Sequence, residues 1–172
     1  KTMAFGGLLL ALTVIFMVLG SVIETSTLFL LAAASFFVGI VVREFGLRTG
    51  AAFYVAGVIL GFAAAPNKFY VFTFAAMGFY IWGREAAWRQ ITAHVRQEKS
   101  KAVFLLSKYV IFNIVYIPIV LIFRNMLFTK AVSGTVLTVI IIAGQIGLLI
   151  YDKAYDYVQV YIWGKMRARV MS

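Results

Sequence analysis

The sequence predicts an all-α integral membrane protein, and three properties of the 172-residue chain support this. Hydrophobic residues make up 63% of the chain and charged residues only 13%, whereas soluble domains average about 45–50% and about 25%. The apolar residues gather in runs long enough to cross a bilayer as helices. Runs such as 28–34 and 139–142 lack the alternating polarity of membrane-barrel strands. We therefore expect a compact helical bundle.

Six membrane spans are expected, separated by short polar clusters. The first is interpreted as a mature helix and not a signal peptide, because it is about 20 residues long and has no clear small-residue cleavage site before Glu24. The second to fourth are short for a hydrocarbon core of about 30 Å, which favours helices packed inside a bundle or helix ends capped by interfacial aromatic residues. In chain order the spans cover about 4–23, 27–42, 49–65, 67–83, 102–123 and 131–150.

Two further segments are expected on one side of the membrane. Within 84–101, apolar residues Trp88, Ile91 and Val95 recur at helical spacing among basic residues, which predicts a short amphipathic helix on the cytoplasmic leaflet or a plain basic anchor. The tail 151–172 is expected to continue the last span into the cytosol or along the interface. Both segments favour anchoring, or docking to a partner.

The distribution of basic residues predicts the orientation. Of the 16 Lys and Arg residues, twelve fall on the side of the two termini and Lys108 lies within a span. The other three, on the opposite side, are Lys68, Arg124 and Lys130. Cytoplasmic loops carry the excess of Lys and Arg, so both termini are predicted to be cytoplasmic. The net charge of +10 is thus interpreted as topology, and no nucleic-acid partner is expected.

Few residues suit catalysis or metal binding. The chain has no cysteine, its single histidine is His94 in the basic segment, and its six carboxylates do not pair within any expected span. Zero cysteine excludes disulfides, a thiol nucleophile and cysteine-ligated metals. We therefore expect no enzyme, no cofactor and no metal site.

A few polar and small residues lie inside the spans. Lys108 is close enough to one end to extend its amine toward the headgroups. Asn113 and Gln145 either hydrogen-bond between helices or line a cavity. Gly7 and Ala11 are four residues apart on the first span, a spacing that lets two helices approach closely, either within the bundle or against another subunit.

The outer ends of the helices are predicted to form a small-molecule site. Short polar clusters lie there next to aromatic residues, and Pro118 is expected to kink the fifth helix and open a pocket. An apolar and aromatic cup with a few polar groups is typical of such sites. The candidate binding residues are Glu24, Asn67, Lys68, Tyr70, Tyr116 and Arg124.

The six-helix layout and a few short stretches resemble the substrate-binding S components of energy-coupling factor (ECF) transporters. These stretches are the opening residues from Lys1 to Leu12, Pro66-Asn67-Lys68 and Gly78-Phe79-Tyr80. The resemblance implies capture of a vitamin-like micronutrient at the plasma membrane of a bacterium. It also implies that a transmembrane coupling subunit and two cytoplasmic ATPases supply the energy, and that Gly7 and Ala11 contact that coupling subunit. Lys68 and Arg124 would favour an anionic group on the substrate.

Two other interpretations remain open. The first is a non-transport scaffold, or a subunit of a larger membrane complex, with the same compact fold. A carrier should have an outward cavity lined by Asn67, Lys68 or Arg124, whereas a scaffold should be packed there. The second is a lipid-modifying enzyme, which would require the clustered carboxylates or histidines that the sequence lacks.

Overall fold

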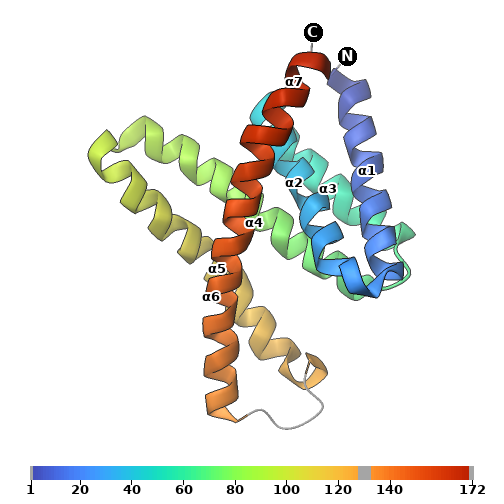
Figure 1. Ribbon diagram of the computed structural model, residues 1–172, viewed down its shortest axis with the longest axis vertical. Coiled ribbons are helices and arrows are strands. Elements are labelled where there is room, and N and C mark those ends of the chain that lie inside the picture. The colour runs from blue at the N-terminus through green and yellow to red at the C-terminus, as the bar shows by residue number, and fades with distance from the viewer. Residues whose placement is uncertain (1, 128–132, 171–172) are drawn as a thin grey trace.

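The structure is a computed structural model, and it describes residues 2–127 and 133–170, without the side chains of residues 2, 124–127 and 170. Every regular element in this part of the chain is a helix, which confirms the predicted all-α fold (Figure 1). The elements in chain order are α1 (Thr2–Val22), the 3-10 turn η1 (Glu24–Ser26), α2 (Thr27–Phe45), α3 (Leu47–Ala64), α4 (Lys68–His94), α5 (Gln97–Leu127), α6 (Gly134–Tyr157), the π-helical segment η2 (Val158–Trp163) and α7 (Gly164–Val170).

Helices α1 to α4 form the main bundle, and α2 lies at its centre against α1, α3 and α4 (Figure 1). The core between them is apolar and includes the fully buried side chains of Met17, Leu31, Val38 and Phe74. Several glycines allow this close packing. A β-carbon at Gly61, for example, would lie 2.9 Å from the side chain of Met17.

Local sequence explains the sharp turns of the bundle. Gly46 separates α2 from α3 with a φ of +93°, a conformation that only glycine adopts without strain. Pro66 follows the end of α3, and Asn67 caps α4 by accepting a hydrogen bond from the amide of Phe69 at 3.0 Å. These residues reverse the chain within a few positions and keep consecutive helices side by side.

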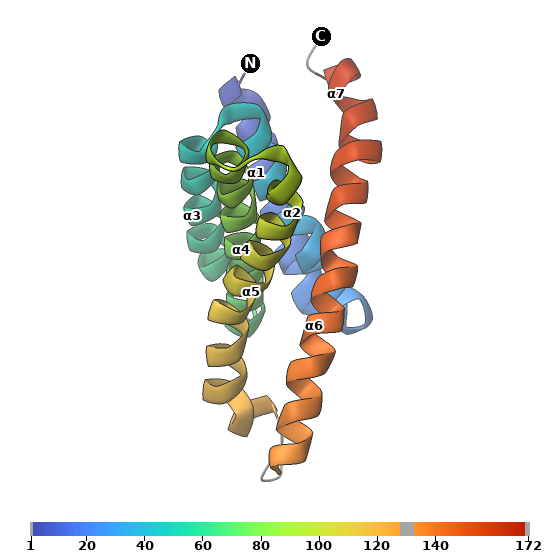
Figure 2. The same ribbon diagram turned by 90° about the vertical axis from the view of Figure 1, so that its left-hand side faces the viewer.

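Within the described residues, five helices are long and apolar enough to cross a membrane. The segments are Met3–Val22, Glu24–Phe45, Leu47–Ala64, Gln97–Phe123 and Gly134–Arg169. Six spans were predicted. The predicted fourth span, 67–83, lies in α4, a long helix that also carries charged residues and is not among the five. The beginning of α1 and the end of α7 lie at the same end of the molecule (Figure 2).

The segment 84–101 differs from the separate interfacial helix that its spacing predicted. Helix α4 continues unbroken to His94, and α5 begins at Gln97, so the segment is divided between the two arms of a helical hairpin (Figure 2). Arg84 and Glu85 are buried in this arrangement. The tail is helical as well: η2 and α7 continue α6 without interruption.

Candidate functional site

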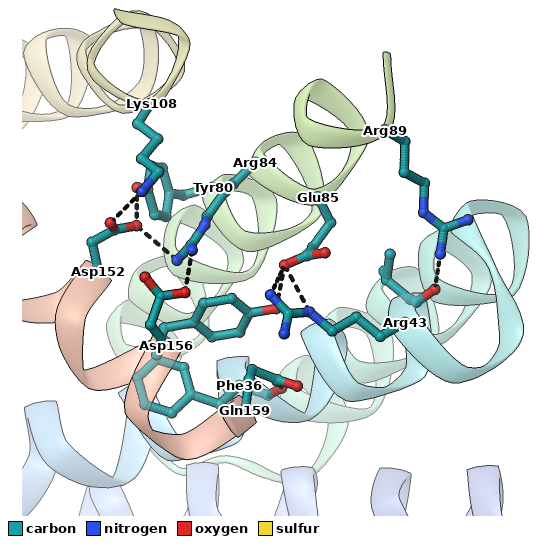
Figure 3. Close-up of polar contacts among 12 residues, drawn as sticks. Phe36, Arg43, Tyr80, Arg84, Glu85, Arg89, Lys108, Asp152, Asp156 and Gln159 are labelled. Atoms are coloured by element: carbon teal, nitrogen blue, oxygen red, sulfur yellow. Dashed lines mark hydrogen bonds and ion pairs between the residues drawn. The ribbon is translucent and has the colours of Figure 1, made fainter. Parts of the chain in front are cut away.

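A cluster of charged side chains joins α4, α5 and α6 (Figure 3). Arg84 of α4 lies between two carboxylates of α6, pairing with Asp152 at 2.7 Å and with Asp156. Lys108 of α5 pairs with the other oxygen of Asp152 at 2.6 Å, and the Tyr80 hydroxyl donates to Asp152 at 2.9 Å. The Arg84 side chain is only 4% exposed. Two cations thus neutralise two carboxylates, and water has little access to Arg84, Lys108 and Asp152, whereas Asp156 lies at the exposed edge of the cluster.

A second ion pair lies beside the first and brings α2 into the arrangement. Arg43 of α2 donates through Nε at 3.0 Å and Nη2 at 2.8 Å to the same carboxylate oxygen of Glu85. The Tyr155 hydroxyl of α6 donates to that oxygen at 2.8 Å. The guanidinium of Arg84 lies over the Tyr155 ring at 4.6 Å. The two pairs therefore form one network that connects α2, α4 and α6 (Figure 3).

Polar contacts continue along α6, η2 and α7 at intervals of four residues, and we call this row the polar ladder. Four of its members contact α2, and Tyr155 contacts Glu85 of α4, the ion-pair partner of Arg43. The members are Tyr151, Tyr155, Gln159, Trp163 and Arg167. An α-helix has 3.6 residues per turn, so a four-residue repeat would drift around it. The π segment η2 contains wider turns. It keeps Gln159 and Trp163 facing α2.

An apolar pocket of about 810 Å³ lies among α4, α5 and α6, with Tyr54 of α3 and Leu28 of α2 on its border. Aromatic rings dominate the lining. Phe112 and Tyr116 stack at 4.8 Å, and Phe69 meets Phe123 edge-on at 6.0 Å. This volume falls within the range of about 300–1,000 Å³ that small-molecule sites occupy. The pocket reaches the charged cluster through Tyr80 and Tyr151, which line its wall.

Of the five predicted substrate residues whose side chains the structure describes, only Tyr116 lines this pocket. Asn67 caps α4, and the amine of Lys68 donates to the carbonyls of Phe62 and Ala65 at the end of α3. Both side chains thus stabilise the turn between α3 and α4. A Pro-Asn-Lys sequence is compatible with this role and with ligand binding, so the sequence alone could not separate the two.

The remaining predicted residues are dispersed. Glu24 is exposed in η1, and Tyr70 packs against the core of the main bundle. The side chain of Arg124 lies outside the described part of the chain, so its expected role stays a prediction. Gly7 and Ala11 are exposed on α1, and no atom lies within 4 Å of a β-carbon built at Gly7. That face of α1 is therefore not used in the packing of the bundle.

The sequence interpretation missed the charged network. Lys108 does not extend toward headgroups but pairs with Asp152. Along the chain, the nearest basic neighbours of Glu44 are Arg43 and Arg48. Glu44 instead accepts from Trp163 at 2.9 Å and pairs with Arg167 of α7. Asp152 and Asp156, one turn apart on an apolar helix, were the available signal, because each needs a cation when buried.

The contacts of the two amides in the predicted spans resolve the alternative left open by the sequence. Asn113 of α5 and Gln145 of α6 exchange hydrogen bonds of 3.2 and 2.8 Å. They join two helices and do not line the pocket. Within the described residues, no group of three or more His, Cys, Asp or Glu side chains is placed to hold a metal ion.

Comparison of the chain with protein-family models, with curated proteins and with solved structures finds no match in any of the three. The functional argument therefore depends on the geometry of this chain.

Proposed function

We propose that the chain is a membrane-embedded subunit that captures a small micronutrient-like molecule and delivers it with energy from separate ATPase partners. The aromatic pocket of about 810 Å³ carries this proposal. Side chains from three helices build the pocket, and membrane proteins commonly hold ligands between the helices of a bundle.

The location proposed for the chain is the bacterial plasma membrane, with several crossings and both termini in the cytoplasm. The large apolar side chains exposed on α5 and α6 support insertion, because they would contact lipid tails. They include Leu106, Ile114, Ile122, Val139 and Ile146. The proposed orientation in the membrane depends on the excess of Lys and Arg residues on the side where the two termini lie.

The proposed partners are a transmembrane coupling subunit and two cytoplasmic ATPases, with the unused face of α1 as the docking surface. Gly7 and Ala11 leave the backbone of that face accessible. Replacing Ala11 with Leu should reduce co-purification of the coupling subunit at least several-fold, whereas Ala63→Leu, at an exposed position of α3, should not. Equal recovery with both variants would remove α1 as the docking face.

The capture function is tested by native mass spectrometry of the protein purified from its own host. A retained small molecule is expected in the unchanged chain. Gly147 lines the pocket, and no atom lies within 4 Å of a β-carbon built there, so Gly147→Leu should place a bulky side chain in the pocket without disturbing the helix. Gly134→Leu adds the same side chain to open space at the start of α6, away from the pocket.

Loss of the small molecule in Gly147→Leu and its retention in Gly134→Leu are the results expected. Equal retention in both variants would place the ligand elsewhere. An empty chain that co-purifies with other envelope proteins would instead support a second function, a non-transport scaffold. One observation favours that alternative: Asn67 and Lys68 hold the turn between α3 and α4 and are not directed into a cavity.

A further inference from the structure

We infer that the ligand of this pocket is an uncharged molecule built from apolar rings or chains. The inference rests on the proposed function for the existence of a ligand and adds its chemical class. It departs from the expectation of an anionic group, which depended on Lys68 and Arg124.

The first argument concerns hydrogen bonds. Five hydroxyl groups line the pocket, and each already has a partner inside the protein. Tyr54 donates to the Ala75 carbonyl at 2.9 Å and Tyr116 to the Ile140 carbonyl at 2.8 Å. The partners of the other three are the Phe69 carbonyl for Thr73, Asp152 for Tyr80 and Ser35 for Tyr151.

Because each hydroxyl has a single proton, the described lining residues have no spare side-chain donor for a ligand carbonyl or carboxylate. A ligand carbonyl or carboxylate would lose its hydrogen bonds to water and gain none from these side chains, at a cost of about 1–3 kcal/mol for each group. An apolar ligand has no such loss. Hydrogen bonding therefore selects against ligands that carry acceptor groups such as carboxylates.

The second argument concerns charge. None of the described lining residues is ionised at neutral pH. The two cations of the charged cluster that Tyr80 of the pocket wall adjoins, Arg84 and Lys108, already pair with Asp152 and Asp156. An anion in the pocket would have to compete with these carboxylates, and a cation would have to compete with Arg84 and Lys108. A buried charge without a partner costs several kcal/mol, so a neutral ligand is favoured.

The third argument concerns shape. Gly144 lets the Tyr116 ring lie where a β-carbon would be, since the distance to that ring would be only 2.3 Å. Tyr116 in turn stacks on Phe112, and both rings face the pocket. Such rings offer flat apolar surfaces against which another ring or a chain packs well.

The test compares two probes that differ by one carboxylate, benzophenone and 4-benzoylbenzoate. Both attach to nearby C–H bonds when illuminated. The purified chain is reconstituted in lipid nanodiscs and illuminated over a range of probe concentrations, and the labelled residues are identified by peptide mass spectrometry. Gly147→Leu serves as the blocked variant and Gly134→Leu as the matched control, with thermal melting to show that both are folded.

Benzophenone should label pocket residues of α5 and α6 in a saturable manner, at least about tenfold more than 4-benzoylbenzoate, since 1.4 kcal/mol corresponds to a factor of ten. This labelling should disappear in Gly147→Leu and persist in Gly134→Leu. Labelling of exposed side chains such as Val160 should rise without saturation in all variants.

Equal pocket labelling by the two probes would overturn the inference while leaving a binding pocket in place. Saturable labelling by the carboxylate alone would also overturn it and would restore the anionic ligand. Pocket labelling that does not saturate, or is absent with both probes, would show a groove filled by bilayer lipid, and then the proposed capture function would fail as well.

Discussion

The main bundle and the long C-terminal helix are attached to the rest of the molecule by opposite kinds of contact. Helices α1 to α4 meet through apolar side chains and glycines, with Met17, Leu31 and Val38 fully buried between them. The helix formed by α6, η2 and α7 meets the bundle largely through polar groups, the polar ladder and the charged cluster. Leu148 of this helix is buried against the bundle, but many of the helix's other apolar side chains point outward, and Val139, Ile142, Ile146 and Val160 are exposed.

This difference indicates what makes a helix interface specific in a membrane. Lipid tails are as apolar as Leu or Val, so apolar side chains gain little from choosing a protein neighbour over lipid unless they pack very closely. Glycines provide such packing in the bundle. Lipid offers no partner for a carboxylate or a guanidinium, so a polar row has only one satisfactory register. The position of the long helix should therefore be set by a few residues.

The largest expected effect is the loss of Arg43. The Glu85 side chain is 5% exposed, and Arg43→Met would leave it with Tyr155 as its donor and without a cation. We expect a loss of about 3–5 kcal/mol in SDS-induced unfolding, with faster hydrogen exchange along α6. The double variant Arg43→Met with Glu85→Met should recover most of the loss, because no charge is then left unpaired. A double variant as unstable as the single one would show that the pair is not what holds the helix.

The next prediction compares the two interfaces by making the same substitution, glycine to alanine, in each and measuring the loss of stability. A β-carbon at Gly39 of α2 would lie 2.1 Å from the Tyr155 hydroxyl oxygen, so Gly39→Ala must displace that rung of the polar ladder. A β-carbon at Gly20 of α1 would meet its nearest atoms at 3.5 Å, an ordinary contact. Gly39→Ala should cost about 1–3 kcal/mol in the same unfolding measurement and Gly20→Ala less than about 0.5 kcal/mol. Similar losses of stability in Gly39→Ala and Gly20→Ala would argue against the idea that the polar ladder sets the position of the long helix.

A smaller effect is expected at the end of the ladder. Trp163→Phe removes the indole N–H that Glu44 accepts while keeping an aromatic ring against the core, and Arg167 still pairs with Glu44. The expected loss is about 0.5–1.5 kcal/mol, seen as increased protease cleavage of α7 rather than unfolding of the bundle. Tyr161→Phe, at an exposed position, is the control. If protease cleavage of α7 is unchanged in Trp163→Phe, the hydrogen bond from Trp163 to Glu44 does not help to hold α7 in place.

The comparison also explains which parts of the structure could be predicted from the sequence. Length and apolar composition depend on each segment alone, so the existence of the helices was predictable, although α4 continues to His94, well past the predicted end of its span. The residues that join segments far apart in the chain were not. Arg84 and Asp152 are 68 positions apart, and only the folded arrangement of α4 and α6 makes them a pair.

The same limit applied to the candidate site. Polar residues in loops were interpreted as ligand groups, but Asn67 and Lys68 satisfy helix ends, and every helix leaves such groups unsatisfied. The pocket lies among apolar residues of α4 to α6, which carry no motif. Tyr116 could be identified because an aromatic residue beside Pro118 was conspicuous, and Phe112, Gly144 and Gly147 could not.

The smallest effect tests whether hydrogen bonds without charge add to the attachment of the long helix. Asn113 and Gln145 exchange two hydrogen bonds between α5 and α6, at 3.2 and 2.8 Å. Such bonds within a bilayer contribute about 0.6 kcal/mol on average, because the separated helices also find partners. Gln145→Leu should therefore reduce unfolding stability by about 0.6 kcal/mol, roughly a fifth of the Arg43→Met effect. Val139→Leu, exposed on the same helix, controls for the change in side chain. A loss as large as that of Arg43→Met would show that position along α6, rather than charge, decides how strongly each contact holds the helix.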